Sequence, residues 1–194
     1  MHLLYLLSII SIGFVFSWPD PPCRIPPLAA NYTIEKYSGR WFEIGKIQTP
    51  GGSFFEKGCV CTHIDVNPTI VNPTIVNVSN ICNKDSPDGK LIISKQTLTS
   101  SMNPSNGRYN ASFLPDLPPV AYNVIVLKTD DYSVEYDCIH EFGITNYCVH
   151  ILSRKPTLDV TIVNSILKLV QELDLNMAKI KYKQTQQENC SYPK

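Results

Sequence analysis

The sequence predicts an all-β protein: an eight-stranded antiparallel up-and-down β-barrel with one C-terminal α-helix packed outside it. Two observations predict this class. Short segments that alternate apolar and polar residues recur along the chain, with turn residues between them. A single later segment repeats its apolar residues at helical spacing.

The first segment of the 194-residue chain is apolar and ends in small and polar residues, which is typical of a secretory signal peptide. We expect residues 1–17 to be this signal peptide, with cleavage after Ser17. The alternative is an uncleaved membrane anchor, but the apolar run is shorter than the about 20 residues that a spanning helix needs. Residues 18–36 then form an extended leader, because prolines disfavour a helix or a central strand there. The expected location is extracellular.

The barrel and its helix are expected over residues 37–182, and residues 183–194 form a polar tail that Cys190 holds in place. Turn signals such as Asn-Pro and Asn-Gly separate the strands. The tandem NPTIVNPTIV at residues 67–76 is too short for a solenoid and is interpreted as a lengthened hairpin connection. The expected strands cover residues 41–47, 59–66, 74–82, 91–99, 108–113, 121–129, 132–139 and 147–154.

The helix is expected over about residues 159–173. Either Thr157 or Asp159 can cap its first turn. A helix with one apolar stripe that follows eight strands must pack against the outside of the sheet. The stripe consists of Val160, Val163, Ile166, Leu167 and Val170.

The charge balance argues against nucleic-acid binding, because 17 basic residues are matched by 17 acidic ones. The seven cysteines favour disulfides and an oxidising compartment. Sequons for N-glycosylation occur at Asn31, Asn77, Asn110 and Asn189.

Alternation along residues 59–66 places Thr62, Ile64 and Val66 on one face of a strand. Cys59, Cys61, His63 and Asp65 fall on the other. Cysteine and histidine are zinc ligands, so a metal site is one interpretation of this second face. In a secreted chain, disulfide cysteines beside a surface histidine are the commoner arrangement. We therefore expect no metal and no cofactor.

Three separated motifs resemble the signatures of the lipocalins. They are SGRWFEI near the first strand, KTDDYSVEYDC at the start of the seventh, and HILSRKP at the end of the last. In detail they are similar to the apolipoprotein D-like branch, and the similarity spans about Cys23 to Cys190. The signature residues are Gly39, Trp41, Thr129, Asp130, Tyr132 and Arg154. The resemblance implies that Trp41 and Arg154 stack at the closed end of the barrel, whereas a role as ligand contacts is the alternative.

The resemblance also implies disulfides between Cys23 and Cys138 and between Cys61 and Cys190. Each closes a loop of more than a hundred residues and contributes about 4 kcal/mol in the loop-entropy model. Cys59 and Cys82 lie outside that pattern, and a β-bulge that brings them onto one face would allow a third disulfide. Cys148 is then a buried free thiol or a link to another chain.

The function that the resemblance implies is secreted transport of a small hydrophobic ligand of the fatty acid, sterol, retinoid or pigment class. Strand alternation and the resemblance together predict the residues that face this ligand. An alternative is a lipid-modifying enzyme in which Cys148 and His150 act together, although both residues can equally be wall packing. A third is an interaction protein that uses Cys148 or the segment FLPDLPPVAY on a partner, a membrane or a lipoprotein, with the oligomeric state open. The predicted ligand-facing residues are Glu43, Thr62, Ile64, Val66, Asn80 and His150.

Overall fold

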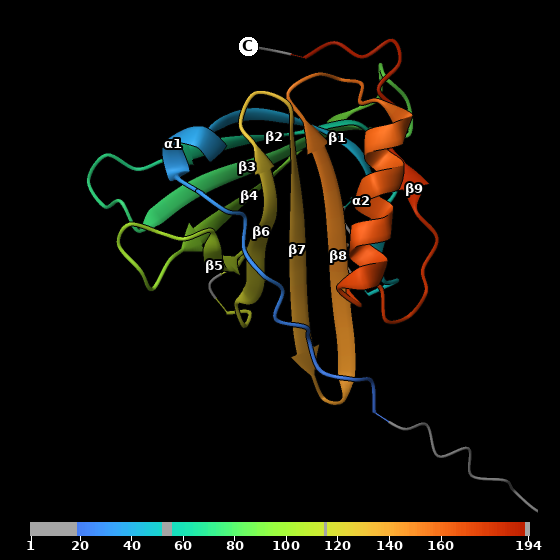
Figure 1. The fold of residues 1–194 in the computed structure, drawn as a ribbon. Coiled ribbons are helices and arrows are strands. Elements are labelled where there is room, and N and C mark those ends of the chain that lie inside the picture. The colour runs from blue at the N-terminus through green and yellow to red at the C-terminus, as the bar shows by residue number, and fades with distance from the viewer. Residues whose placement is uncertain (1–18, 52–55, 115, 193–194) are drawn as a thin grey trace, which may run out of the picture.

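The computed structural model describes residues 19–51, 56–114 and 116–192. The expected signal peptide, residues 1–17, lies outside these ranges. Eight main strands form in the order expected, separated by the turn segments named above (Figure 1). They are β1 (Gly39–Gln48), β2 (Cys59–Pro68), β3 (Ile75–Lys84), β4 (Leu91–Thr99), β5 (Arg108–Ser112), β6 (Val120–Lys128), β7 (Tyr132–Glu141) and β8 (Ile144–Ser153).

Each strand pairs with the next in antiparallel register, and β8 returns to β1. The pairing of β1 with β2 closes the barrel over only part of its height, from Gly39 opposite Val66 to Phe42 opposite His63. Beyond Phe42 the two strands separate. The predicted up-and-down barrel is therefore confirmed, and it has a seam between β1 and β2 near one end.

Helix α2 (Val160–Glu172) lies outside the barrel, as predicted, beside β8 in Figure 1. Asp159 caps it by accepting a hydrogen bond from the backbone N–H of Thr161. Its buried residues, Val163, Ile166 and Val170, share a core with outward-facing side chains of β1, β7 and β8. Val160 belongs to the predicted stripe but is exposed, because it stands in the first turn.

The leader is extended over the outside of the strands, and Figure 1 shows it passing in front of β7 and β6. The Ala29 N–H donates to the carbonyl of Val124, and Cys23 is bonded to Cys138. One expectation for the leader is wrong. The segment assigned to it ends in a one-turn helix, α1 (Ile34–Tyr37), because Thr33 caps that turn once the prolines have ended.

The C-terminal tail covers the seam between β1 and β2. A short strand that the sequence did not predict, β9 (Lys183–Gln184), pairs with β1. Beyond it, the Gln187 side-chain amide donates to the backbone carbonyls of both Glu43 and Thr62. The tail therefore bridges the two strands where they no longer pair with each other.

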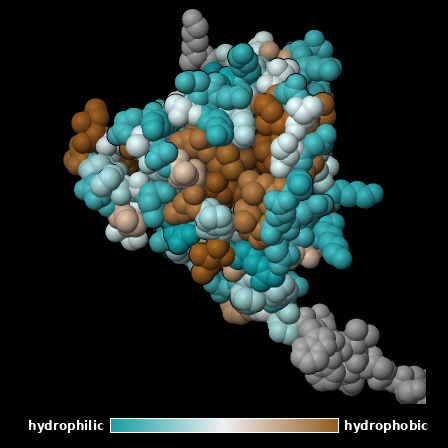
Figure 2. All heavy atoms as spheres, viewed as in Figure 1, coloured by the Kyte–Doolittle hydropathy of each residue, from teal (hydrophilic) through white to brown (hydrophobic). Residues whose placement is uncertain are grey.

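Apolar side chains gather in the middle of the face shown in Figure 2, and polar ones surround them. The loop between β2 and β3 also carries exposed Ile70 and Val71. This loop is the tandem sequence, which does connect a hairpin as predicted. Within the described ranges, no helix has the length and apolar character needed to cross a membrane.

Candidate ligand-binding site

The closed end of the barrel is built around Trp41. Its side chain is fully buried, and its indole N–H donates to the carbonyl of Tyr37 at 2.7 Å. The guanidinium of Arg154 lies 3.5 Å from the centroid of the indole, close enough for a cation–π interaction. Arg154 also donates to the backbone carbonyls of Lys36, Ser38, Arg40 and Thr129, at 2.8 to 3.0 Å.

Gly39 has a positive φ of 92°, and a Cβ at this position would stand 3.4 Å from the Arg154 guanidinium. Glycine therefore relieves backbone strain at the point where the chain enters the barrel beside the arginine. Thr129 and Asp130 lie in the neighbouring β6–β7 turn, and Tyr132 begins β7. The signature residues thus gather at the closed end, in the structural arrangement that the resemblance implies.

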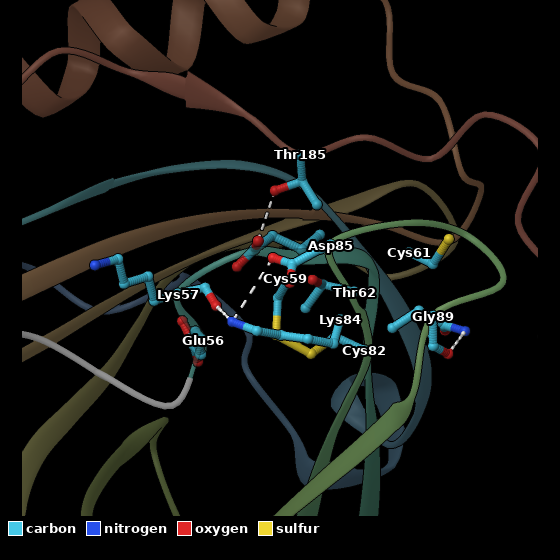
Figure 3. Close-up of a disulfide and its surroundings, with 12 residues drawn as sticks. Glu56, Lys57, Cys59, Cys61, Thr62, Cys82, Lys84, Asp85, Gly89 and Thr185 are labelled. Atoms are coloured by element: carbon cyan, nitrogen blue, oxygen red, sulfur yellow. Dashed lines mark hydrogen bonds and ion pairs between the residues drawn. A yellow bond between two sulfur atoms is a disulfide. The ribbon is translucent and has the colours of Figure 1, made fainter.

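A β-bulge in β2 explains where its cysteines point. Cys61 and Thr62 together oppose one position of β3, and Cys61 has a positive φ of 56°. The expectation that Cys59 and Cys61 share a face is wrong, because the extra residue shifts the alternation. Cys59 turns inward and bonds to Cys82 across the strand pair (Figure 3).

Cys61 turns outward and bonds to Cys190 in the tail. His63 is also on the outer side, but it is not the surface residue expected, because the ring of Tyr192 covers it edge-on at 5.3 Å between centroids. The three bonded pairs are those anticipated from the sequence, and Cys148 is a buried free thiol. Cys59 and Cys61 each form a disulfide with a different partner, so neither has a thiolate that could bind zinc.

The sequence-predicted ligand-facing residues converge inside the barrel, with one exception. Glu43, Thr62, Ile64, Asn80 and His150 line an inner cavity of about 20 Å³. Val66 lies deeper, in the core that surrounds Trp41 at the closed end. Side chains therefore almost fill the half of the barrel that is nearer the closed end.

A buried polar network surrounds this inner cavity. His150 Nδ1 lies 2.8 Å from a carboxylate oxygen of Glu43, and Lys46 Nζ lies 3.5 Å from the same oxygen. Lys46 also pairs with Glu56, and His150 Nε2 is 3.5 Å from Asp137. Burial makes unpaired charges costly, so each cation here is placed between two carboxylates.

The network sets the charge of its members. Burial alone would raise the pKa of Glu43, but Lys46 and His150 outweigh it and lower that pKa to about 2. Burial would likewise lower the pKa of His150, whereas its contacts with Cys148, Asp137 and Glu43 raise it well above the ordinary value. At neutral pH, Glu43 is therefore an anion and His150 an imidazolium.

Glu135 is the exception among the buried acids. Burial, reinforced by the charge of Asp137, raises its pKa to about 7, against a partial lowering by His150 and two tyrosines. The Tyr37 hydroxyl donates to its carboxylate and also contacts the Tyr122 hydroxyl. This acid is consequently close to half-protonated at neutral pH.

Sequence reasoning missed Lys46, Glu56, Glu135 and Asp137 as interior residues. Along β7, charged Glu135 and Asp137 alternate with apolar Val134, Tyr136 and Cys138, a pattern that normally places the charges in solvent. Here the apolar face points outward because α2 and the leader cover it. The sequence did predict an external helix, and that helix was the feature that could have indicated an outward-pointing apolar face on β7.

A second, larger cavity opens at the barrel mouth, between the β5–β6 loop and the end of the β7–β8 hairpin. Its volume is about 440 Å³, within the size range of small-molecule sites. Its wall is mostly apolar and includes Ile92, Phe113, Leu117, Val120 and Ile139. Cys148 also lines it, but burial raises the pKa of this thiol to about 11 despite the nearby His150. Because the thiolate is the nucleophilic form, this shift disfavours the alternative of a catalytic cysteine.

Comparisons with known proteins agree with this architecture. No protein family model matches the chain. Apolipoprotein D of Mus musculus is 28% identical over 169 residues, covering 87% of this chain and 84% of the relative. Apolipoprotein D of Oryctolagus cuniculus is 27% identical over 188 residues, covering 95% and 93%.

Two solved structures share the fold. Insecticyanin from the tobacco hornworm Manduca sexta superposes with a TM-score of 0.66 at 17% identity, covering 89% of this chain and 92% of that one. Lobster apocrustacyanin A1 superposes with a TM-score of 0.61 at 14% identity, covering 87% and 93%.

The barrel, its external helix and the stacked Trp41 and Arg154 at its closed end give the chain the fold of the lipocalins. In sequence, the chain is similar to apolipoprotein D over most of its length.

Proposed function

We propose that the protein is a secreted carrier that binds one small hydrophobic molecule at the mouth of its barrel and catalyses no reaction. The observation that carries this proposal is the apolar cavity of about 440 Å³. The resemblance to lipocalins supports it and suggests fatty acids, sterols, retinoids or pigments as ligand classes. Three disulfides support passage through an oxidising compartment, and all four sequon asparagines are exposed to glycosylation.

The cavity size sets the expected affinity. A ligand that buries about 400 Å² of apolar surface gains about 10 kcal/mol from desolvation. Loss of translational and rotational freedom opposes binding by about 4 kcal/mol or more. The remaining free energy corresponds to a dissociation constant of roughly 10 to 100 μM. Polar contacts with residues of the inner cavity would strengthen binding and orient the ligand; these residues include Glu43, Asn80 and His150.

Titration with the neutral fluorophore N-phenyl-1-naphthylamine tests this function. We expect saturable fluorescence enhancement with one site per chain. Leu117→Arg places a charge in the cavity wall and should weaken binding at least tenfold. Ile70→Arg is the matched control, because Ile70 is an exposed aliphatic residue of the β2–β3 loop and does not line the cavity. Absence of saturable binding by the folded protein, or equal effects of both variants, would refute the proposal.

A further inference from the structure

We propose that the ligand is a hydrophobic amine, bound with its apolar body in the mouth cavity and its ammonium group at Asp137. The inference rests on the proposed carrier function and adds the chemical class of the ligand. It depends on the position of Asp137, on unpartnered buried polar atoms and on the balance of buried charge.

Asp137 stands where the two cavities meet. Its side chain lines both the apolar mouth cavity and the polar inner cavity, and Phe113 is the other residue common to both. An apolar ligand inserted from the mouth would therefore reach the carboxylate of Asp137 with its inner end. The inner cavity, of about 20 Å³, has space for about one water molecule, and an ammonium group is of similar size.

The inner cavity presents hydrogen-bond acceptors that have no donor. Asp137 Oδ1 and Gln96 Oε1 are buried without a hydrogen-bond partner in the described structure, and so is the Thr62 hydroxyl. Gln96 and Thr62 are 7% and 4% exposed, and both line this cavity. Buried polar atoms are normally paired, because leaving one unsatisfied is costly. An ammonium group carries three donors and no acceptor, which is the complement of this set.

The charge around the cavity also favours a cation. Four carboxyl groups line it, those of Glu43, Glu56, Glu135 and Asp137. Among the described residues, the cationic groups that pair with them are Lys46 and His150. Acids thus exceed bases, and a ligand carboxylate placed at Asp137 would be repelled, whereas an ammonium would be attracted. A neutral alcohol would be tolerated, because it can donate one hydrogen bond.

The test compares three ligands that have the same twelve-carbon alkyl length, namely dodecylamine, dodecanol and dodecanoic acid. Each displaces N-phenyl-1-naphthylamine from the protein at neutral pH, well below its micelle-forming concentration. We expect dodecylamine to bind at least tenfold more tightly than dodecanoic acid, with dodecanol between them. A preference for the acid, or equal affinities while the fluorophore binds, would overturn the inference and leave the carrier function intact. If neither the fluorophore nor any of the three ligands binds, both the inference and the carrier function are overturned.

Asp137→Asn removes the charge and keeps the shape of the side chain. The ratio of acid to amine dissociation constants should fall about tenfold, toward one. The ratio is measured within each protein, so a general change in pocket quality does not reproduce it. Asp131→Asn is the matched control, because Asp131 is an exposed aspartate in the β6–β7 turn, and it should keep the wild-type ratio. A wild-type ratio in Asp137→Asn would contradict the placement of the ammonium at Asp137.

Discussion

Replacing Glu135 by glutamine should change how the stability of this protein depends on pH. The carboxyl group is buried inside the barrel, where it accepts a hydrogen bond from the Tyr37 hydroxyl. Its pKa is raised from 4.5 to about 7, with burial as the largest cause. Glutamine has the same shape, carries no charge and keeps an oxygen that can accept the same hydrogen bond.

The sign follows from proton binding. Between pH 4.5 and about 7, folded Glu135 retains a proton that the unfolded chain has already released. The free energy of unfolding therefore falls as the pH rises through this range. Over the whole range, the pKa difference of Glu135 between the folded and unfolded states lowers the free energy of unfolding by about 3 kcal/mol, at 1.36 kcal/mol for each unit of pKa. Glu135→Gln resembles the protonated form, so it should match the parent near pH 4 and exceed its stability by up to about 3 kcal/mol near pH 8.

Urea denaturation followed by tryptophan fluorescence at several pH values measures this difference. Other titrating groups, including Glu43 and His150, contribute to both proteins and largely cancel in the comparison. Glu141→Gln, an exposed glutamate at the end of the same strand, is the control and should shift stability by less than about 0.5 kcal/mol. A stability difference for Glu135→Gln that stays constant from pH 4 to pH 8 would refute the reasoning.

Two further predictions concern the closed end and the free thiol. Arg154→Lys keeps the charge but cannot reach all four carbonyls that the guanidinium contacts, so we expect a loss of about 3 kcal/mol. Thermal unfolding should show a fall of about 6–12 °C in Tm, while the exposed neighbour variant Lys155→Gln stays close to the parent. Cys148 should react slowly with iodoacetamide near pH 7.5 in the native protein and quickly in denaturant, because burial raises its pKa to about 11. Mass spectrometry measures the extent of alkylation, and rapid alkylation of Cys148 in the native protein would favour the catalytic alternative.

The strands were predictable because alternation and turn residues repeat along the chain. β4 begins and ends at the expected residues, and α2 begins within one residue of the expected start. The faces of the strands were harder to predict. The bulge at Cys61 and Thr62 arises from the pairing of two strands, and the alternation within one strand contains no record of it.

The candidate site was predictable only in part. Glu43 and His150 were placed inside correctly by alternation and resemblance, and the structure adds that they contact each other. Asp137 was missed because local alternation assigns charges to solvent unless something covers the opposite face. The mouth cavity is formed by side chains from several loops and strand ends, so no single segment could predict its shape.

The tail that covers the seam also sets the order of events when the protein is made. Thr185 donates to Glu43 at 2.6 Å, and the Cys61 N–H donates to the carbonyl of Gln186, so residues of the tail form part of the barrel wall. Cys61 is synthesised 129 residues before the cysteine with which it pairs. Domains generally fold as units during synthesis. The barrel wall and the Cys61–Cys190 disulfide can therefore form only after the segment that contains Thr185, Gln186 and Cys190 has been synthesised.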